Sequence, residues 1–328
     1  MLALTLALAL ASPPSHADGG GDFEPVKPPP PTPWAMAGAR PFVECQEAER
    51  QAEVRRHGPS SGARGGSGSQ PLLWSRRAQR CPHAPLVLAE AATEEIVLLG
   101  PLLRGVEGWG GDDPAKVQEV ADEHQRRLRR ALAWLTRAQQ ESTRRGQRPP
   151  RENLYWRAYA LTGLGRLDAA RRLVTEASAK GDIEHWRAVR LAALVEVMDG
   201  DLDEAVELSA FALQATEGAG PSNDRAISRY IRAFVLVRAG ASEFAMEELR
   251  DLRRGAGHRD SREAVESVLP IHERLFLRAI DHTANGEDSN AYRLWHAYLA
   301  RPEPLAPERV LAKRFLVEIA PPGPVVAP

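Results

Sequence analysis

Apolar residues recur at helical spacing over residues 114–143. They lie one or two helical turns apart, which is the pattern of a helix that buries one face. Asp113 followed by Pro114 supplies a capping residue and a proline for the first turn, and Pro149 and Pro150 follow the end. The pattern predicts one long helix, whose buried face carries Val117, Val120, Leu128, Leu132 and Leu135.

The second half of the chain repeats one spacing four times. Each copy has an apolar residue, Arg or Ala, then Ala, six residues, Gly, four residues and Ala. Gly suits the left-handed end of a first helix, and Ala lets a second helix pack closely against it. The spacing predicts an all-α domain at 149–320, with helix pairs at 151–164 and 167–179, 183–198 and 202–216, 223–239 and 242–254, and 262–285 and 288–300, then a last helix at 306–319.

Pro270 lies inside the predicted helix 262–285, where it marks either a kink or the start of a separate helix. The turn glycines of the four copies are Gly165, Gly200, Gly240 and Gly286. An arginine precedes the first Ala in three copies, at Arg157, Arg232 and Arg278, although helix packing does not require one.

Residues 151–300 resemble the tetratricopeptide repeat family, most closely at the turns 165–170 and 200–205. Three arginines stand where the family usually has a buried leucine, and Glu196 replaces an aromatic residue. The resemblance implies a right-handed α–α superhelix whose first helices line a groove for a partner's peptide or helix. The groove residues it implies are Tyr155, Tyr159, Arg187, Arg190, Tyr230, Phe234, Arg238 and Phe276. Some of them, especially Phe234 and Phe276, could instead pack between repeats.

The N-terminal part reads as an export signal followed by a spacer. An apolar run at 2–11 and Ser15-His16-Ala17 predict a signal peptide over 1–17 and a periplasmic or secreted protein, and a Pro/Gly-rich linker follows at 18–40. A small helical segment at 41–84, with a flexible loop at 58–70, leads to a helical region at 85–148, and a tail at 321–328 ends the chain.

The two cysteines, Cys45 and Cys81, either form a disulfide, as export would allow, or are separate buried thiols. Two cysteines do not make a structural zinc site, and we expect no metal.

Charge adds one local feature to this picture. The formal net charge is −1, so we expect no nucleic-acid partner. Arginines gather between residues 126 and 151, where Glu141 is the one acid. This basic patch, represented by Arg126, Arg127, Arg130 and Arg137, is either a solvated helix face or a contact for an acidic partner or an envelope polymer.

No residue pattern indicates catalysis, a cofactor or a transmembrane segment. The sequence therefore favours a non-catalytic protein-binding scaffold or adaptor of the cell envelope. Two alternatives stay open: an accessory component of peptidoglycan or another envelope-polymer machinery that uses the arginine-rich helix, and a structural module that associates with itself.

Overall fold

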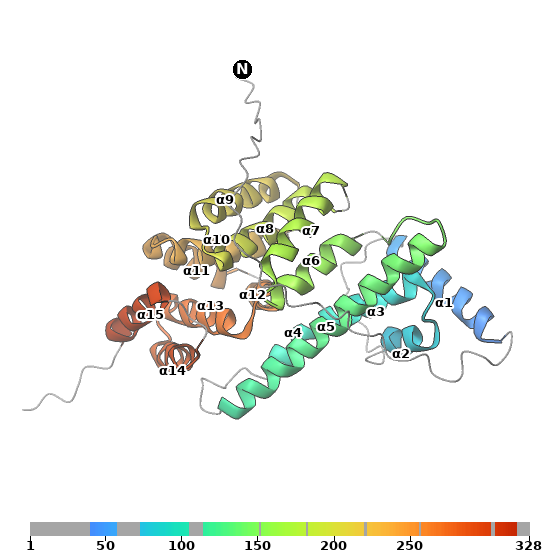
Figure 1. Ribbon diagram of the computed structural model, residues 1–328. Coiled ribbons are helices and arrows are strands. Elements are labelled where there is room, and N and C mark those ends of the chain that lie inside the picture. Colours follow the sequence, from blue (N-terminus) through green and yellow to red (C-terminus); the bar gives the residue numbers. More distant parts are fainter. Residues whose placement is uncertain are drawn as a thin grey trace, which may run out of the picture. The chain divides into compact units, whose positions relative to one another are not determined.

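A computed structural model describes residues 40–57, 73–104, 114–150, 152–181, 183–219, 222–255, 257–302 and 306–319, all within the unit Pro31–Pro328. Throughout these ranges every regular element is a helix, which confirms the all-α fold class (Figure 1). The predicted signal peptide, the linker up to residue 39, the loop 58–70 and the tail 321–328 lie outside the described residues.

The N-terminal helices pack around α3. They are α1 (Arg40–His57), α2 (Leu73–Arg80), α3 (Pro85–Val97), α4 (Leu99–Arg104) and α5 (Pro114–Arg144). Cys45 of α1 and Cys81, just after α2, form a disulfide across 36 residues, so the paired alternative is confirmed. The Glu94 carboxylate accepts hydrogen bonds from the backbone N–H groups of Trp74 (3.3 Å) and Ser75 (2.9 Å), which satisfies donors at the start of α2.

Four helix pairs follow in the predicted order, and helices that are consecutive within them pack side by side. They are α6 (Asn153–Gly163) with α7 (Leu167–Ala179), α8 (His185–Asp199) with α9 (Leu202–Ala219), α10 (Ser222–Arg238) with α11 (Ser242–Arg253), and α13 (Ile271–Ala284) with α14 (Asp288–Leu299). The helix α15 (Ala306–Ile319) packs on α14.

The physical reason for the fixed spacing is visible at the turns. Gly200 ends α8 with φ 93°, a left-handed conformation that glycine adopts without strain, and its counterparts in the other three pairs also have positive φ. The repeated alanines are wholly buried, as at Ala193 and Ala205, which lets the two backbones of a pair approach closely. Gly and Ala therefore set how each pair turns and packs.

Pro270 begins a separate helix, so the predicted helix over 262–285 is corrected to two. The chain forms α12 (His258–Glu266) first, and α13 starts directly after the proline. Pro270 has φ −57° and ψ 159°, an extended conformation that cannot continue a helix. The short helix α12 packs mainly on α10 and also reaches α4, far back in the chain.

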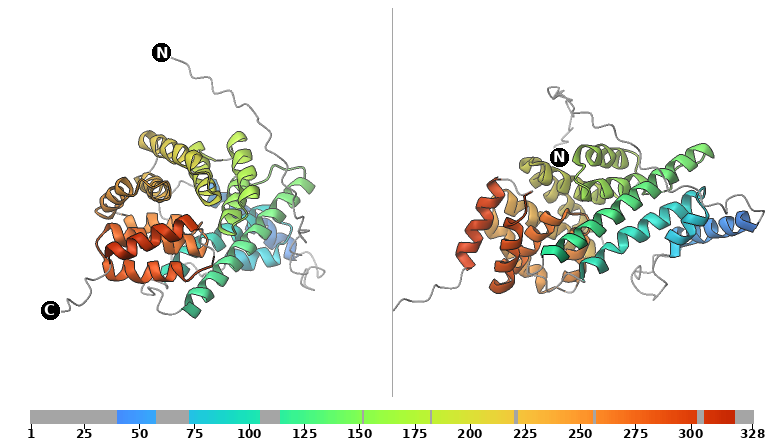
Figure 2. Two further views of the ribbon diagram at one scale, coloured as in Figure 1. Left: turned by 60° about the vertical axis from the view of Figure 1, so that its left-hand side comes forward. Right: turned by 60° about the horizontal axis from the view of Figure 1, so that its bottom comes forward.

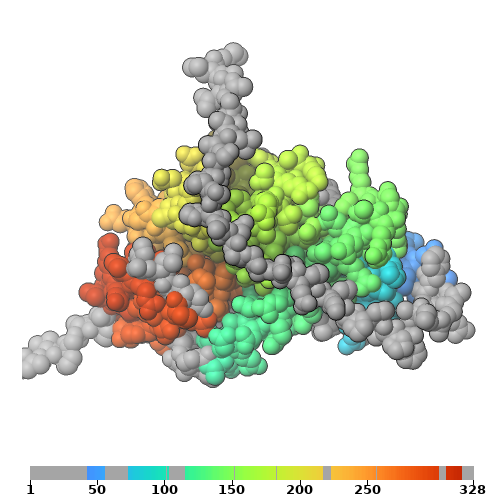
Figure 3. All heavy atoms as spheres, in the orientation of Figure 1, coloured from blue at the N-terminus to red at the C-terminus, as the bar shows by residue number. Residues whose placement is uncertain are grey.

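The C-terminal helices return to α5 and α6. The His124 Nε2 atom lies 3.0 Å from the Ser267 carbonyl oxygen, and Arg301 donates to Gln118 at 3.0 Å. The last helix pair lies beside the first part of α5 in both views of Figure 2, and their surfaces abut in Figure 3. Residues that follow α12 and α14 thus lie against α5.

Candidate interaction site

The eight predicted groove residues fall into two clusters and one isolated position. Tyr155, Tyr159, Arg187 and Arg190 gather where α6 meets α8, and Phe234, Arg238 and Phe276 gather between α10 and α13. Tyr230 stands apart from both, beneath α12.

The first group forms an aromatic–arginine cluster that is partly open to solvent. The Arg187 guanidinium lies 4.8 Å from the Tyr155 ring centroid and 5.8 Å from that of Trp156. Such short distances allow cation–π attraction. The Arg190 guanidinium lies 4.5 Å from the ring centroid of Trp186, which belongs to the same cluster. Trp156, Trp186 and Arg187 keep part of their surface exposed, whereas Tyr155 and Tyr159 are buried below them.

Glu152 holds this cluster in place. One carboxylate oxygen accepts from Trp156 Nε1 at 3.0 Å, and the other accepts from Arg187 Nη1 at 2.8 Å. Among the described residues Glu152 alone combines a side chain with a positive φ, which is 67°. That conformation costs free energy for a residue with a side chain and persists where the surroundings enforce it, as the two contacts of the Glu152 carboxylate do here.

Each of the two arginines of the cluster lies beside an acid, but their pKa values shift in opposite directions. Burial acts to lower the pKa of Arg187, but Tyr155 and Glu152 outweigh it, and the pKa lies above its ordinary value. Arg190 is more deeply buried, and burial lowers its pKa although Asp224 accepts from it at 3.2 Å. The cluster therefore presents aromatic surface with one guanidinium group, that of Arg187, already fixed in position.

The second group is closed. Phe234 and Phe276 are wholly buried, with ring centroids 5.9 Å apart, and Arg238 lies over both rings. The Arg238 guanidinium forms ion pairs with the buried carboxylates of Glu273 and Glu308. The prediction that these residues line an open groove is therefore corrected. They pack between repeats, as the alternative for Phe234 and Phe276 stated.

The helix α12 covers Tyr230, which corrects the prediction at this residue too. The His258 ring lies 5.6 Å from the Tyr230 ring, and Ser261 Oγ donates to Asn223 Oδ1 at 2.6 Å. Just beyond α12, the Ser267 hydroxyl shares a hydrogen bond with the hydroxyl of Tyr159. A segment of the same chain thus occupies the surface where the resemblance implied a partner.

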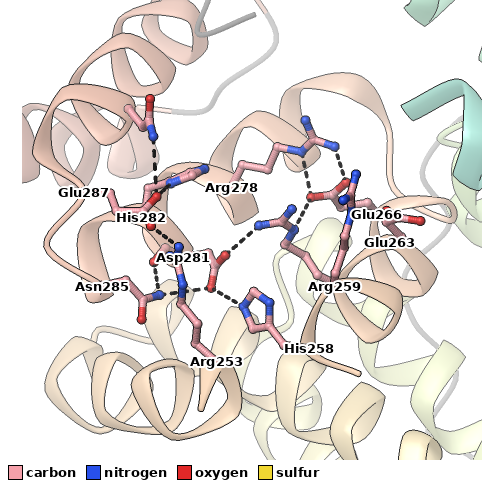
Figure 4. Close-up of polar contacts among 12 residues, drawn as sticks. Arg253, His258, Arg259, Glu263, Glu266, Arg278, Asp281, His282, Asn285 and Glu287 are labelled. Carbon is pink, nitrogen blue, oxygen red and sulfur yellow. Dashed lines mark hydrogen bonds and ion pairs between the residues drawn. The ribbon is translucent and has the colours of Figure 1, made fainter. Parts of the chain in front are cut away.

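Buried ion pairs join α12 to α13 (Figure 4). Glu266 accepts from Arg278 at 2.7 and 2.6 Å, and Arg262 donates to Asp281 at 2.9 Å. Burial acts to raise the pKa of the Glu266 carboxyl, but Arg278 and Arg262 outweigh it and hold that pKa below its usual range. Two positive and two negative side chains thus balance one another out of solvent.

Acids outside the arginine-rich segment compensate the predicted basic patch. Arg130 donates to both carboxylate oxygens of the buried Glu95, at 3.1 and 3.2 Å, and Arg127 forms ion pairs with Glu95 and Glu123. Arg126 pairs with Glu123, one helical turn away, and Arg137 is partly exposed on α5. Glu123 lies on α5 within one helical turn of Arg126 and Arg127, whereas Glu95 belongs to α3, so its share of the compensation is not visible from neighbouring positions along α5.

No protein-family model and no curated protein matches this sequence. The structure is similar to the crystal structure of a tetratricopeptide repeat protein from Parabacteroides merdae. The two chains are 14% identical, the match covers 84% of this chain and 99% of the other, and the TM-score is 0.37.

The described residues contain no group of three or more His, Cys, Asp or Glu side chains placed to hold a metal ion. No described helix is both long and apolar enough to cross a membrane.

Sequence reasoning missed Glu152, Trp156 and Trp186. Trp156 belongs to the repeated spacing, where it reads as an ordinary packing position. Glu152 precedes Trp156 by four residues, which places the two on one side of a helix. This spacing could have indicated their contact. The contact of Trp186 with Arg190, also four residues apart, follows the same rule.

Proposed function

We propose that this protein is a non-catalytic scaffold that binds a segment of a partner protein at the aromatic–arginine cluster. The partly exposed surface of Trp156, Trp186 and Arg187, fixed in advance by Glu152, is the observation that carries the proposal. Tryptophan, tyrosine and arginine dominate the binding energy of protein interfaces. Side chains that are already ordered lose less conformational entropy when a partner binds.

We place this activity in an oxidising compartment of the cell envelope. The Cys45–Cys81 disulfide supports that placement, because such bonds persist outside the reducing cytosol. This placement is tested by quenching cells with acid and then alkylating their free thiols with a polymer that carries a maleimide group. Full protection of both cysteines is expected without reductant, and modification of both in untreated cells would refute the placement.

Site-specific photo-crosslinking in the native host tests the binding site. A photoreactive residue at Glu184, whose side chain is 46% exposed beside Arg187, is expected to give one protein adduct of defined mass. The same residue at Phe244 on α11, which is 72% exposed, is the control and is expected to give none.

The aromatic surface itself is tested by adding Trp156→Ala and Trp186→Ala to the protein that carries the photoreactive residue at 184. The adduct is expected to disappear while the circular dichroism spectrum and the melting temperature stay near those of the parent protein. An adduct that survives both substitutions, or that forms equally at 244, would show that the partner binds elsewhere.

A further inference from the structure

The helix α12 is an insertion between two helix pairs. Successive turn glycines are 35 residues apart from Gly165 to Gly200 but 46 apart from Gly240 to Gly286, and the additional residues hold α12. Gly257, with φ 83°, precedes the helix and Pro270 follows it. The insertion is thus bounded by two residues that stop a helix, while α11 and α13 keep their places in the repeat pattern.

Apolar and polar groups both hold α12: Val265 is buried in the main hydrophobic core, and polar side chains contact α10 and α13. Ser261 meets Asn223 of α10, Arg262 meets Asp281 of α13, and Glu266 meets Arg278 of α13. A helix of nine residues does not form by itself in water, so these contacts order α12. Exchanging a buried ion pair for another of the same geometry costs little, whereas leaving one charge unpaired costs a great deal.

We propose that α12 occupies a docking surface for a partner's helix, formed by Asn223 and Tyr230 of α10 and by Arg278 and Asp281 of α13. A partner helix takes this surface when α12 leaves it. Arg278 and Asp281 cannot stay buried without counter-charges. The partner must therefore supply the negative and the positive side chain that α12 supplies. It carries an arginine and a glutamate four residues apart, a small hydroxyl residue directly before the arginine, and an apolar residue directly before the glutamate in place of the buried Val265.

The docking surface continues the site of the proposed function, on which this inference rests. Tyr159 packs against Trp156 in the aromatic–arginine cluster, with ring centroids 5.4 Å apart, and also contacts Ser267 at the end of α12. The buried Tyr159 thus joins the cluster to the residue that follows α12.

A synthetic peptide of residues 257–270, capped at both ends and carrying a fluorophore, tests the proposal without any native partner. The full-length double variant Arg262→Ala/Glu266→Ala, whose own α12 lacks both charges, is expected to bind this peptide on the order of ten-fold more tightly than the unaltered protein does. A peptide that carries the same two substitutions is the matched control and is expected to bind at least about ten-fold more weakly. Equal binding of both peptides, or none to the folded double variant, would overturn the proposal.

Hydrogen exchange on the unaltered protein keeps the proposal testable if the double variant does not fold. Amides of α12 are expected to exchange at least about ten-fold faster than those of α10 and α13, through an opening confined to the insertion. In the variant Asn223→Cys/Ser261→Cys, a disulfide between α10 and α12 is expected to remove this difference. Exchange of α12 at the same rate as α13 in the unaltered protein would show that α12 does not leave the surface. Since neither measurement uses the native partner, their failure is distinct from failure of the cross-link at 184.

Discussion

Gly163 is the residue that lets α6 approach both α5 and the turn after α12. A β-carbon at this position would lie 2.5 Å from Leu128 Cδ1 and 3.0 Å from the carbonyl oxygen of Val268. The side chain of Leu128 could move aside, but the backbone at Val268 belongs to the segment that leads into α13. Close approach, and not a special backbone angle, therefore requires glycine here.

We predict that Gly163→Ala lowers the free energy of unfolding by about 1–3 kcal/mol, because it overpacks the junction of three helices. Urea unfolding followed by circular dichroism measures the change. Gly100→Ala in α4 is the matched control, since its nearest new contact is an ordinary 3.6 Å from Glu263 Oε2. It should leave stability unchanged or slightly raised. Equal losses in both variants would contradict this account of the junction.

The recurrent arginine shows how one position in the repeat serves different neighbours. Arg278 binds the wholly buried Glu266 of α12, Arg232 lies 3.6 Å from Glu248 of α11, and Arg157 donates to Gln139 of α5. Each arginine pairs with a different helix, so its partners could not be predicted from the repeat. The position is partly hydrated at Arg232, whose side chain is 39% exposed, and buried at Arg278.

This difference predicts unequal costs for one substitution at equivalent positions. Arg278→Leu is expected to lower the free energy of unfolding by about 3–5 kcal/mol, because it leaves the Glu266 carboxylate buried without its bidentate partner. Arg232→Leu is expected to cost less than about 1 kcal/mol, since 39% of its side chain is exposed and its ion pair is solvated. Chemical denaturation of both variants measures the two losses in the free energy of unfolding. Similar losses would refute the prediction of unequal costs.

At the level of helices, the sequence predicts those turns and packing contacts that residues close together in the chain determine. Gly200 and Ala205 specify a turn and a close packing contact within six residues of each other, so four helix pairs could be predicted from the spacing. Pro270 indicated that the predicted helix is interrupted. It did not indicate where the separate helix α12 packs, because α12 is held by Asp281 and Arg278, which lie after it in the chain.

At the level of the whole molecule, contacts join residues that lie far apart in the sequence. Such contacts determine which of the predicted groove residues stay open to solvent. His124 meets Ser267 and Arg274, which are 143 and 150 residues further along the chain. Spacing within a repeat carries no information about a contact at that separation. The cluster around Trp156 was therefore partly predictable through Tyr155, Tyr159, Arg187 and Arg190, whereas the covering of Tyr230 was not.

The same junction makes the stability of the whole protein depend on pH. Burial, together with the neighbouring Arg274, lowers the pKa of His124 well below its ordinary value, so its ring stays neutral in the folded protein. Burial also lowers the pKa of His282. In the unfolded chain a histidine takes up a proton near pH 6.5, and the unfolded state therefore binds more protons below that pH. Stability is thus complete above about pH 6.5 and falls as the solution is acidified.

We predict a loss that approaches about 1.4 kcal/mol per pH unit from His124 between about pH 6 and pH 5, with a smaller loss from His282, measured by urea unfolding at a series of pH values. His124→Gln is expected to reduce the slope by one proton, because glutamine can occupy the site without titrating. Below about pH 4 a second loss is expected in both proteins. There Glu266 and Asp281, whose pKa values the ion pairs hold low in the folded state, take up protons on unfolding. An unchanged slope in His124→Gln between pH 6 and 5 would mean that the junction tolerates a charged imidazole beside Arg274.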